Sequence, residues 1–115
     1  MNEPVSTSSD QHLADMFGAL AHPARIRILR HLAGHSACNC KQVVGEVKLA
    51  QSTVSQHLKV LVEAGLVRYE PRQQQSSYSL APVAIEILSN SIARFAGECC
   101  APCAAPLKRI TPNGQ

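Results

Sequence analysis

The chain has 115 residues, a length that suits one domain and excludes a two-domain enzyme. Its formal net charge is +3, and residues 21–80 hold eight of the eleven Lys and Arg residues but only three of the eight acidic residues. A basic centre of this kind points to a polyanionic partner. Aromatic residues make up only 3% of the chain, so we expect a thin core that a partner subunit would help to cover.

No run of about 20 apolar residues is present, so the sequence predicts no membrane span. Residues 1–10 lack the basic start and the apolar stretch of a signal peptide. We therefore expect a cytoplasmic protein, in a compartment that keeps thiols reduced. The number of Cys residues, five, is odd, which also argues against a framework of disulfides.

The predicted elements are mainly helical. Residues 1–9 are polar and predict a disordered lead, after which apolar side chains recur at helical spacing in five segments. The predicted helices span 10–20, 23–34, 41–48, 51–64 and 82–96. Two alternating runs, 66–70 and 77–80, flank a polar connection and predict a β-hairpin. The expected architecture is one domain over 10–97, mainly α with a small β-hairpin, followed by a flexible Cys-containing tail over 98–115.

The helix over 51–64 has an apolar stripe, and the polar residues near its start are predicted to face outward. These residues are Gln51, Ser52, Thr53, Ser55, Gln56, His57 and Lys59. All of them can donate hydrogen bonds, as a helix in the DNA major groove must. With the preceding short helix and the hairpin, whose tip carries Arg72 and Gln73, they form the parts of a winged helix-turn-helix. The alternative is an ordinary solvated face, but residues 51–62 lack the acidic side chains usual there.

Two segments resemble the ArsR/SmtB family of metalloregulatory repressors. They are Leu20-Ala-His-Pro-Ala-Arg-Ile-Arg-Ile-Leu29 and Leu49-Ala-Gln-Ser-Thr-Val-Ser-Gln-His-Leu-Lys-Val-Leu61, and the resemblance extends over 10–97. It implies a homodimer joined through its first and last helices, with one recognition helix in each half-site of double-stranded operator DNA. It also implies that Gln51, Ser52, Thr53, Ser55, Gln56 and His57 face the DNA, and that His22 has a structural role.

The Cys residues form two clusters, which predict a sensor of soft or thiophilic ions. Cys99, Cys100 and Cys103 supply the three sulfur ligands that trivalent arsenic or antimony requires, whereas structural zinc normally takes four ligands. They resemble the C-terminal arsenic sites of the family. Cys38 and Cys40 resemble another site of the family, at the start of the third helix, and are secondary candidates. The alternatives are small buried residues at 38 and 40 and an incidental tail at 99–103.

The sequence therefore predicts a repressor of an arsenic-resistance operon that As(III) or Sb(III) releases from DNA. Two variants of the same fold stay open: a repressor that responds to thiol oxidation or persulfide, and a sensor of Cd, Pb or Zn. Four His residues are interpreted as surface or capping residues rather than ligands: His12, His22, His31 and His35. An enzyme is not expected, because Cys38 and Cys40 lack the CxxC spacing and no Gly-rich phosphate loop follows a predicted strand. A protein-interaction module that binds no DNA is the remaining option.

Overall fold

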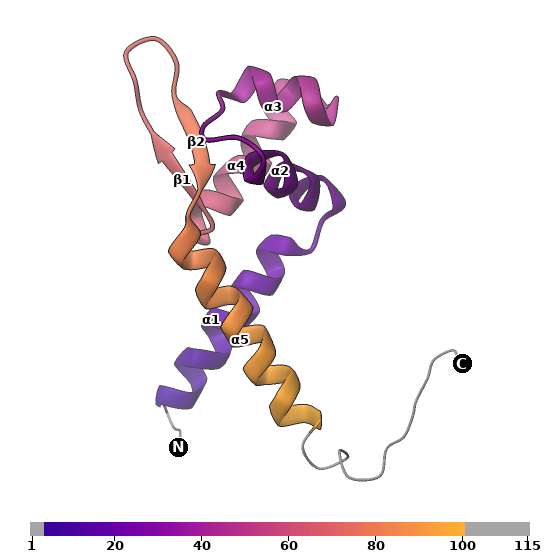
Figure 1. Ribbon diagram of the computed structural model, residues 1–115, viewed down its shortest axis with the longest axis vertical. Coiled ribbons are helices and arrows are strands. Elements are labelled where there is room, and N and C mark those ends of the chain that lie inside the picture. Colours follow the sequence, from indigo (N-terminus) through magenta and orange to yellow (C-terminus); the bar gives the residue numbers. More distant parts are fainter. Residues whose placement is uncertain (1–3, 101–115) are drawn as a thin grey trace, which may run out of the picture.

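The computed structural model describes residues 4–100, which form five helices and one two-stranded antiparallel sheet (Figure 1). In chain order the elements are α1 (Pro4–Leu20), α2 (Pro23–Ala33), α3 (Cys40–Val47), α4 (Gln51–Glu63), β1 (Val67–Glu70), β2 (Ser77–Leu80) and α5 (Pro82–Cys100). This is the mainly α architecture with a small hairpin that the sequence predicts. Within the described residues, no helix is both long and apolar enough to cross a membrane.

Local capping explains where the central helices begin. At the start of α2, the ring nitrogen Nδ1 of His22 accepts a hydrogen bond of 3.1 Å from the backbone of Ala24, while Pro23 occupies the first turn. His22, which the sequence predicts to be a surface or capping residue, is therefore a cap. At the start of α3, Asn39 and Gln42 cap each other's backbone N–H groups in a capping box.

The two terminal helices are longer than predicted. α1 begins at Pro4 rather than at residue 10, so helix covers 4–9, where the composition predicted a disordered lead. Proline is well tolerated in a first helical turn. α5 runs through Gly97 to Cys100, although its predicted end was near 96. A glycine inside a helix costs only about 1 kcal/mol relative to alanine, too little to stop this one. Cys99 and Cys100 therefore belong to a helix and not to a tail.

We call α2, α3, α4 and the hairpin the body, and α1 with α5 the arm. The body holds most of the buried core, which consists of Met16, Ala19, Ile28, Leu32, Cys38, Val43, Val47, Val54, Leu58, Leu61, Leu66, Val67 and Leu88. In Figure 1 the two helices of the arm cross and extend away from the body. The radius of gyration is 17.6 Å, against about 13 Å for a compact domain of this length.

The hairpin is attached to the loop between α2 and α3. Within the sheet, Val67 pairs with Leu80 and Glu70 with Ser77. Outside it, Cys38 and Tyr78 exchange two backbone hydrogen bonds of 2.9 and 2.7 Å, which form an isolated bridge. We call this hairpin, residues 67–80, the wing. The loop that carries Cys38 is therefore held against its second strand, β2.

Candidate nucleic-acid interface and thiol sites

One face of α4 is polar and exposed, as the sequence predicts. The exposed residues are Gln51, Ser52, Thr53, Ser55, Gln56 and Lys59, and the opposite face buries Val54, Leu58 and Leu61. Ala50 precedes α4 and provides no side-chain cap, so the first N–H groups of this helix are available to an anion such as a DNA phosphate. The exposed face thus combines side chains that can donate hydrogen bonds with a helix N-terminus.

His57 does not lie on that exposed face, which corrects the predicted orientation. Its side chain is 8% exposed, and its Nδ1 accepts a hydrogen bond of 3.1 Å from Nε of Arg25. Burial, and secondarily the charges of His22 and Arg25, lower the pKa of His57 below its usual value. The same Arg25 side chain donates to the backbone oxygen atoms of Gly18 and Ala19 at the end of α1. His57 is therefore a structural link between α4, α2 and the arm.

The hairpin tip lies at the far end of the body from the arm (Figure 1). Arg72 and Gln73 are both exposed there. A guanidinium nitrogen of Arg72 lies 3.4 Å from a carboxylate oxygen of Glu70, and both side chains are more than half exposed. An exposed pair of this kind contributes little to stability, so Arg72 is free to change partner and contact a phosphate.

Cys40 lies where the hairpin, α3 and α4 meet. Its sulfur is 3.7 Å from Oγ of Ser55, a predicted DNA-facing residue, and the adjacent Asn39 donates a hydrogen bond of 2.7 Å to Oε1 of Gln75 in the wing. These residues line one small surface pocket together with Gln51. A chemical change at the Cys40 thiol would therefore alter its contact with Ser55 in α4.

Cys38 has a different environment, although only one residue separates it from Cys40. Its side chain is buried, its sulfur lies 3.6 Å from Nε2 of His31, and burial raises the pKa of its thiol. The two thiols thus face different partners. The ligand atoms of His31, His35 and Cys38 instead lie within 4.8 Å of one another. The sequence does not predict this cluster, because only His31 lies in α2, and His35 and Cys38 belong to the loop that follows it.

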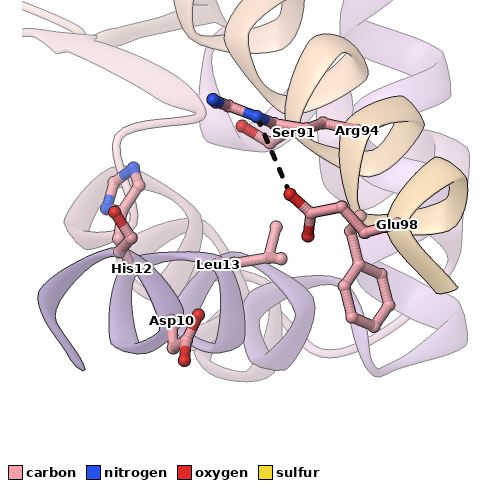
Figure 2. A pocket seen from close by; sticks show the side chains of 8 residues that line it. Asp10, His12, Leu13, Ser91, Arg94 and Glu98 are labelled. Atoms are coloured by element: carbon pink, nitrogen blue, oxygen red, sulfur yellow. Dashed lines mark ion pairs between the residues drawn. The ribbon is translucent and has the colours of Figure 1, made fainter. Parts of the chain in front are cut away.

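Cys99 and Cys100 are exposed in the last turn of α5, and Cys103 lies outside the described residues. Beside them, between α1 and α5, is a groove lined by residues that include Asp10, His12, Leu13, Arg94 and Glu98 (Figure 2). Figure 2 shows Leu13 directed into this groove, with the Arg94–Glu98 ion pair of 4.0 Å on the α5 side. The exposed thiols and the groove share the outer end of the arm.

Comparison with known proteins identifies the family. A helix-turn-helix domain matches residues 20–70. The chain is 35% identical over 79 residues to the transcriptional repressor SmtB homolog of Synechocystis, covering 69% of this chain and 59% of that protein. It is 39% identical over 77 residues to the uncharacterized HTH-type transcriptional regulator Rv0081 of Mycobacterium tuberculosis, covering 66% of this chain and 68% of that one. The chain belongs to the ArsR/SmtB family.

Solved structures agree with this assignment. The crystal structure of M. tuberculosis Rv0081 superimposes with a TM-score of 0.60 at 31% identity, covering 90% of this chain and 100% of that one. An ArsR-like transcriptional regulator from Rhodococcus sp. RHA1 has the same fold, with a TM-score of 0.73 at 21% identity, covering 85% and 92%. The matched regions span 59%, 46% and 62% of three of the curated relatives, among them the SmtB homolog.

Proposed function

We propose that this protein is a homodimeric transcriptional repressor that binds double-stranded operator DNA of an arsenic-resistance operon. As(III) or Sb(III) bound to Cys99, Cys100 and Cys103 would release it. The observation that carries the DNA-binding part is the exposed polar face at residues 51–59 of α4, which has no acidic side chain and lies beside a wing that carries Arg72. In this proposal six residues of α4 and two of the wing contact DNA: Gln51, Ser52, Thr53, Ser55, Gln56, Lys59, Arg72 and Gln73. No catalytic step is part of the proposal.

The arm supports the dimer. Phe17 and Phe95 form an edge-to-face pair with ring centroids 6.2 Å apart, yet they are 37% and 45% exposed. Ile92 and Ile87 on α5 are also exposed. A second copy of the arm would cover these side chains, and the two α4 helices would then reach half-sites about one helical turn apart.

The donor set at the end of α5 fits a metalloid better than zinc. Sulfur ligands select thiophilic ions, and the chain supplies three Cys over 99–103, while the sequence from 82 to 103 contains no His. The side chains of successive helical residues point about 100° apart, so the sulfur atoms of Cys99 and Cys100 do not converge on one point in the helix. A third thiol, from Cys103, would complete the three-sulfur site. Bound As(III) would supply three strong bonds to sulfur.

The residues around this site determine the consequence of binding. The thiols give up their protons to become ligands, and the end of α5 must adjust so that their sulfur atoms converge. Because α5 contacts α1, and α1 is joined to α4 through Arg25 and His57, a shift in the arm changes the separation of the recognition helices. A coupling free energy of about 1–3 kcal/mol is typical of such linkage.

The test is a titration of the protein on its own upstream DNA in a phosphine reductant, which does not compete for arsenite as a thiol would. We expect arsenite to weaken binding by roughly 5–150-fold, the range typical of allosteric coupling. Cys99→Ser, Cys100→Ser and Cys103→Ser should each abolish this response, whereas the matched control Cys40→Ser should retain it. Undiminished DNA affinity in arsenite, or induction that survives Cys99→Ser and Cys100→Ser, would contradict the metalloid site.

A thiol-oxidation or persulfide sensor is the second candidate, because Cys99 and Cys100 are adjacent and exposed. Its mark would be a disulfide or polysulfide link formed on oxidation, with loss of DNA binding that a reductant reverses. Mass spectrometry separates the candidates: metalloid binding adds one arsenic atom per site and leaves the thiols recoverable, whereas oxidation removes two thiol hydrogens per disulfide. A sensor of Cd, Pb or Zn at the secondary residues Cys38 and Cys40 is the third variant.

A further inference from the structure

We propose that His31, His35 and Cys38 form a second metal site, which binds one divalent ion of the zinc class. It lies at the end of α2 in the body, whereas the proposed metalloid site lies on the arm. The two sites also differ in chemistry, because this one offers two imidazoles and a single thiol and so cannot hold a three-thiolate arsenic centre.

The separation of the Cys38 and His31 ligand atoms matches tetrahedral coordination, and the His35 ligand atom lies nearby. The ligand atoms lie within 4.8 Å of one another, and the Cys38 sulfur is 3.6 Å from His31 Nε2. Zinc bonds of about 2.0 Å to nitrogen and 2.3 Å to sulfur, at a tetrahedral angle, place two such ligands about 3.5 Å apart. The rings of His31 and His35 already lie side by side, with centroids 4.2 Å apart. Little movement is needed to close the site.

His35 has the hydrogen-bonded outer partner that metal-binding His residues usually have, and His31 has a carboxylate within ion-pair distance. His35 Nδ1 lies 2.7 Å from the backbone oxygen of His31, a hydrogen bond that leaves Nε2 with its lone pair. His31 Nδ1 lies 3.9 Å from a carboxylate oxygen of Glu46, while its Nε2 faces Cys38. A metal on Nε2 keeps the proton on Nδ1, where it can be donated to Glu46. These contacts leave Nε2 of each ring available as the metal ligand.

Charge and access are compatible with a dication. Cys38 is buried, but His35 is exposed and a surface pocket reaches His31, His35 and Glu46. A metal would displace the thiol proton, and the resulting thiolate together with Glu46 would balance its two positive charges. Arg27 and Arg30 line the same pocket and oppose cation binding, so we expect moderate affinity. A water molecule would take the fourth position on the open side.

The site is joined to the DNA-binding parts through its backbone. Cys38 pairs with Tyr78 in β2, and Asn39 both caps α3 and contacts Gln75 in the wing. A metal would therefore tie the end of α2 to the start of α3 and to the wing. This tie would also change the affinity of the protein for DNA. Only that effect rests on the proposed function, because metal binding itself is measured without DNA.

The experiment is a Co²⁺ titration of the full-length reduced protein, followed by displacement with Zn²⁺. The background is the Cys99→Ser, Cys100→Ser, Cys103→Ser triple variant, which removes the arm thiols. We expect one Co²⁺ per chain, the absorption of tetrahedral cobalt and a thiolate-to-cobalt charge-transfer band. His35→Ala, at an exposed position, should weaken Co²⁺ binding more than tenfold, and Glu46→Gln about tenfold through its outer-shell role. The matched control His12→Ala should leave binding unchanged.

Cys38→Ser should remove the charge-transfer band, and circular dichroism checks that this variant folds. His35→Ala keeps the proposal falsifiable if Cys38→Ser does not fold. Absence of the band in the triple variant would overturn the site, as would a Co²⁺ affinity that His35→Ala leaves intact. Neither result bears on arsenite release, because the triple variant already lacks the metalloid ligands.

Discussion

The body and the arm differ in how far they bury their apolar side chains. The body buries Ile28, Leu58 and Leu66 completely, whereas α5 contributes Leu88 as its one buried residue among those described. The arm instead leaves Phe95 and Ile92 partly exposed. A domain of this size has little apolar surface to spare. The contrast indicates a body that is stable through its own packing and an arm that, in the proposed dimer, a second copy would complete.

The two proposed ligand sites follow the same contrast. His31, His35 and Cys38 are already close together, with outer-shell contacts in place. Cys99 and Cys100 are exposed on successive helical positions and must rearrange to share a ligand. A preformed site binds its ligand with little structural change, whereas the residues of an unformed site must move when the ligand binds. The arm is therefore the better place for an inducer, and the body for an ion that stabilises.

The largest effect should come from the core of the body. Leu58→Ala removes a completely buried side chain of α4, so we expect the free energy of unfolding to fall by about 2–5 kcal/mol. Urea denaturation followed by circular dichroism measures this loss. Leu49→Ala is the control, because Leu49 is 38% exposed and its loss should have a much smaller effect. Equal losses in the two variants would show that the body does not depend on this core.

A smaller effect, of a different kind, should come from the arm. Phe95→Glu places a charge on the exposed apolar face of α5, and we expect the dimer dissociation constant to rise about 30-fold, or about 2 kcal/mol. Sedimentation velocity over a concentration series measures the shift. Asn90→Asp adds a charge to α5 at a position about 140° around the helix axis from Phe95 and should leave the dimer intact. If the wild-type protein stayed monomeric at all concentrations, the claim that a second copy covers the arm would be wrong.

The pH dependence of stability should be a third, smaller effect, centred on the junction of body and arm. Burial lowers the pKa of His57, so below the unfolded value of about 6.5 the unfolded chain binds a proton that the folded chain resists. The free energy of unfolding should therefore fall as the pH drops from 7.5 to 5.5. His57→Gln should flatten this slope while its amide oxygen still accepts from Arg25. An unchanged slope in the variant would assign the dependence to the other His residues.

Sequence patterns predicted the body better than the arm. Pro23 and Gly65 are local signals, and the predicted starts and ends of α2, α4 and the strands agree with the structure within about one residue. The end of α5 was wrong because Gly97 was interpreted as a stop, although a long apolar helix tolerates one glycine. Local signals are therefore dependable where a strong breaker coincides with the end of an apolar pattern.

The site residues show a second reason for error. His57 was predicted to face outward because it is polar, but its spacing from Val54 and Leu61 puts it on the buried face. The cluster of His31, His35 and Cys38 depends on the pairing of Cys38 with Tyr78, which lies 40 positions further along the chain. No local pattern contains such a contact. The exposure of the α4 residues that we propose to face DNA was predictable, because it follows helical periodicity alone.

The smallest expected effect on stability concerns the wing, where the body meets its proposed DNA partner. Arg72 and Glu70 form an exposed ion pair of 3.4 Å, so Arg72→Ala should change the free energy of unfolding by less than about 0.5 kcal/mol. Its effect should appear in DNA binding instead: affinity falls similarly for all sequences, and the slope of log affinity against log salt decreases by about 1. Fluorescence anisotropy at several salt concentrations measures both.

Gln56→Ala, on α4, should instead weaken discrimination between sequences while leaving the salt slope nearly unchanged. If Arg72→Ala altered sequence preference and left the salt slope unchanged, the wing would be reading bases, and the division of roles between α4 and the hairpin would be reversed.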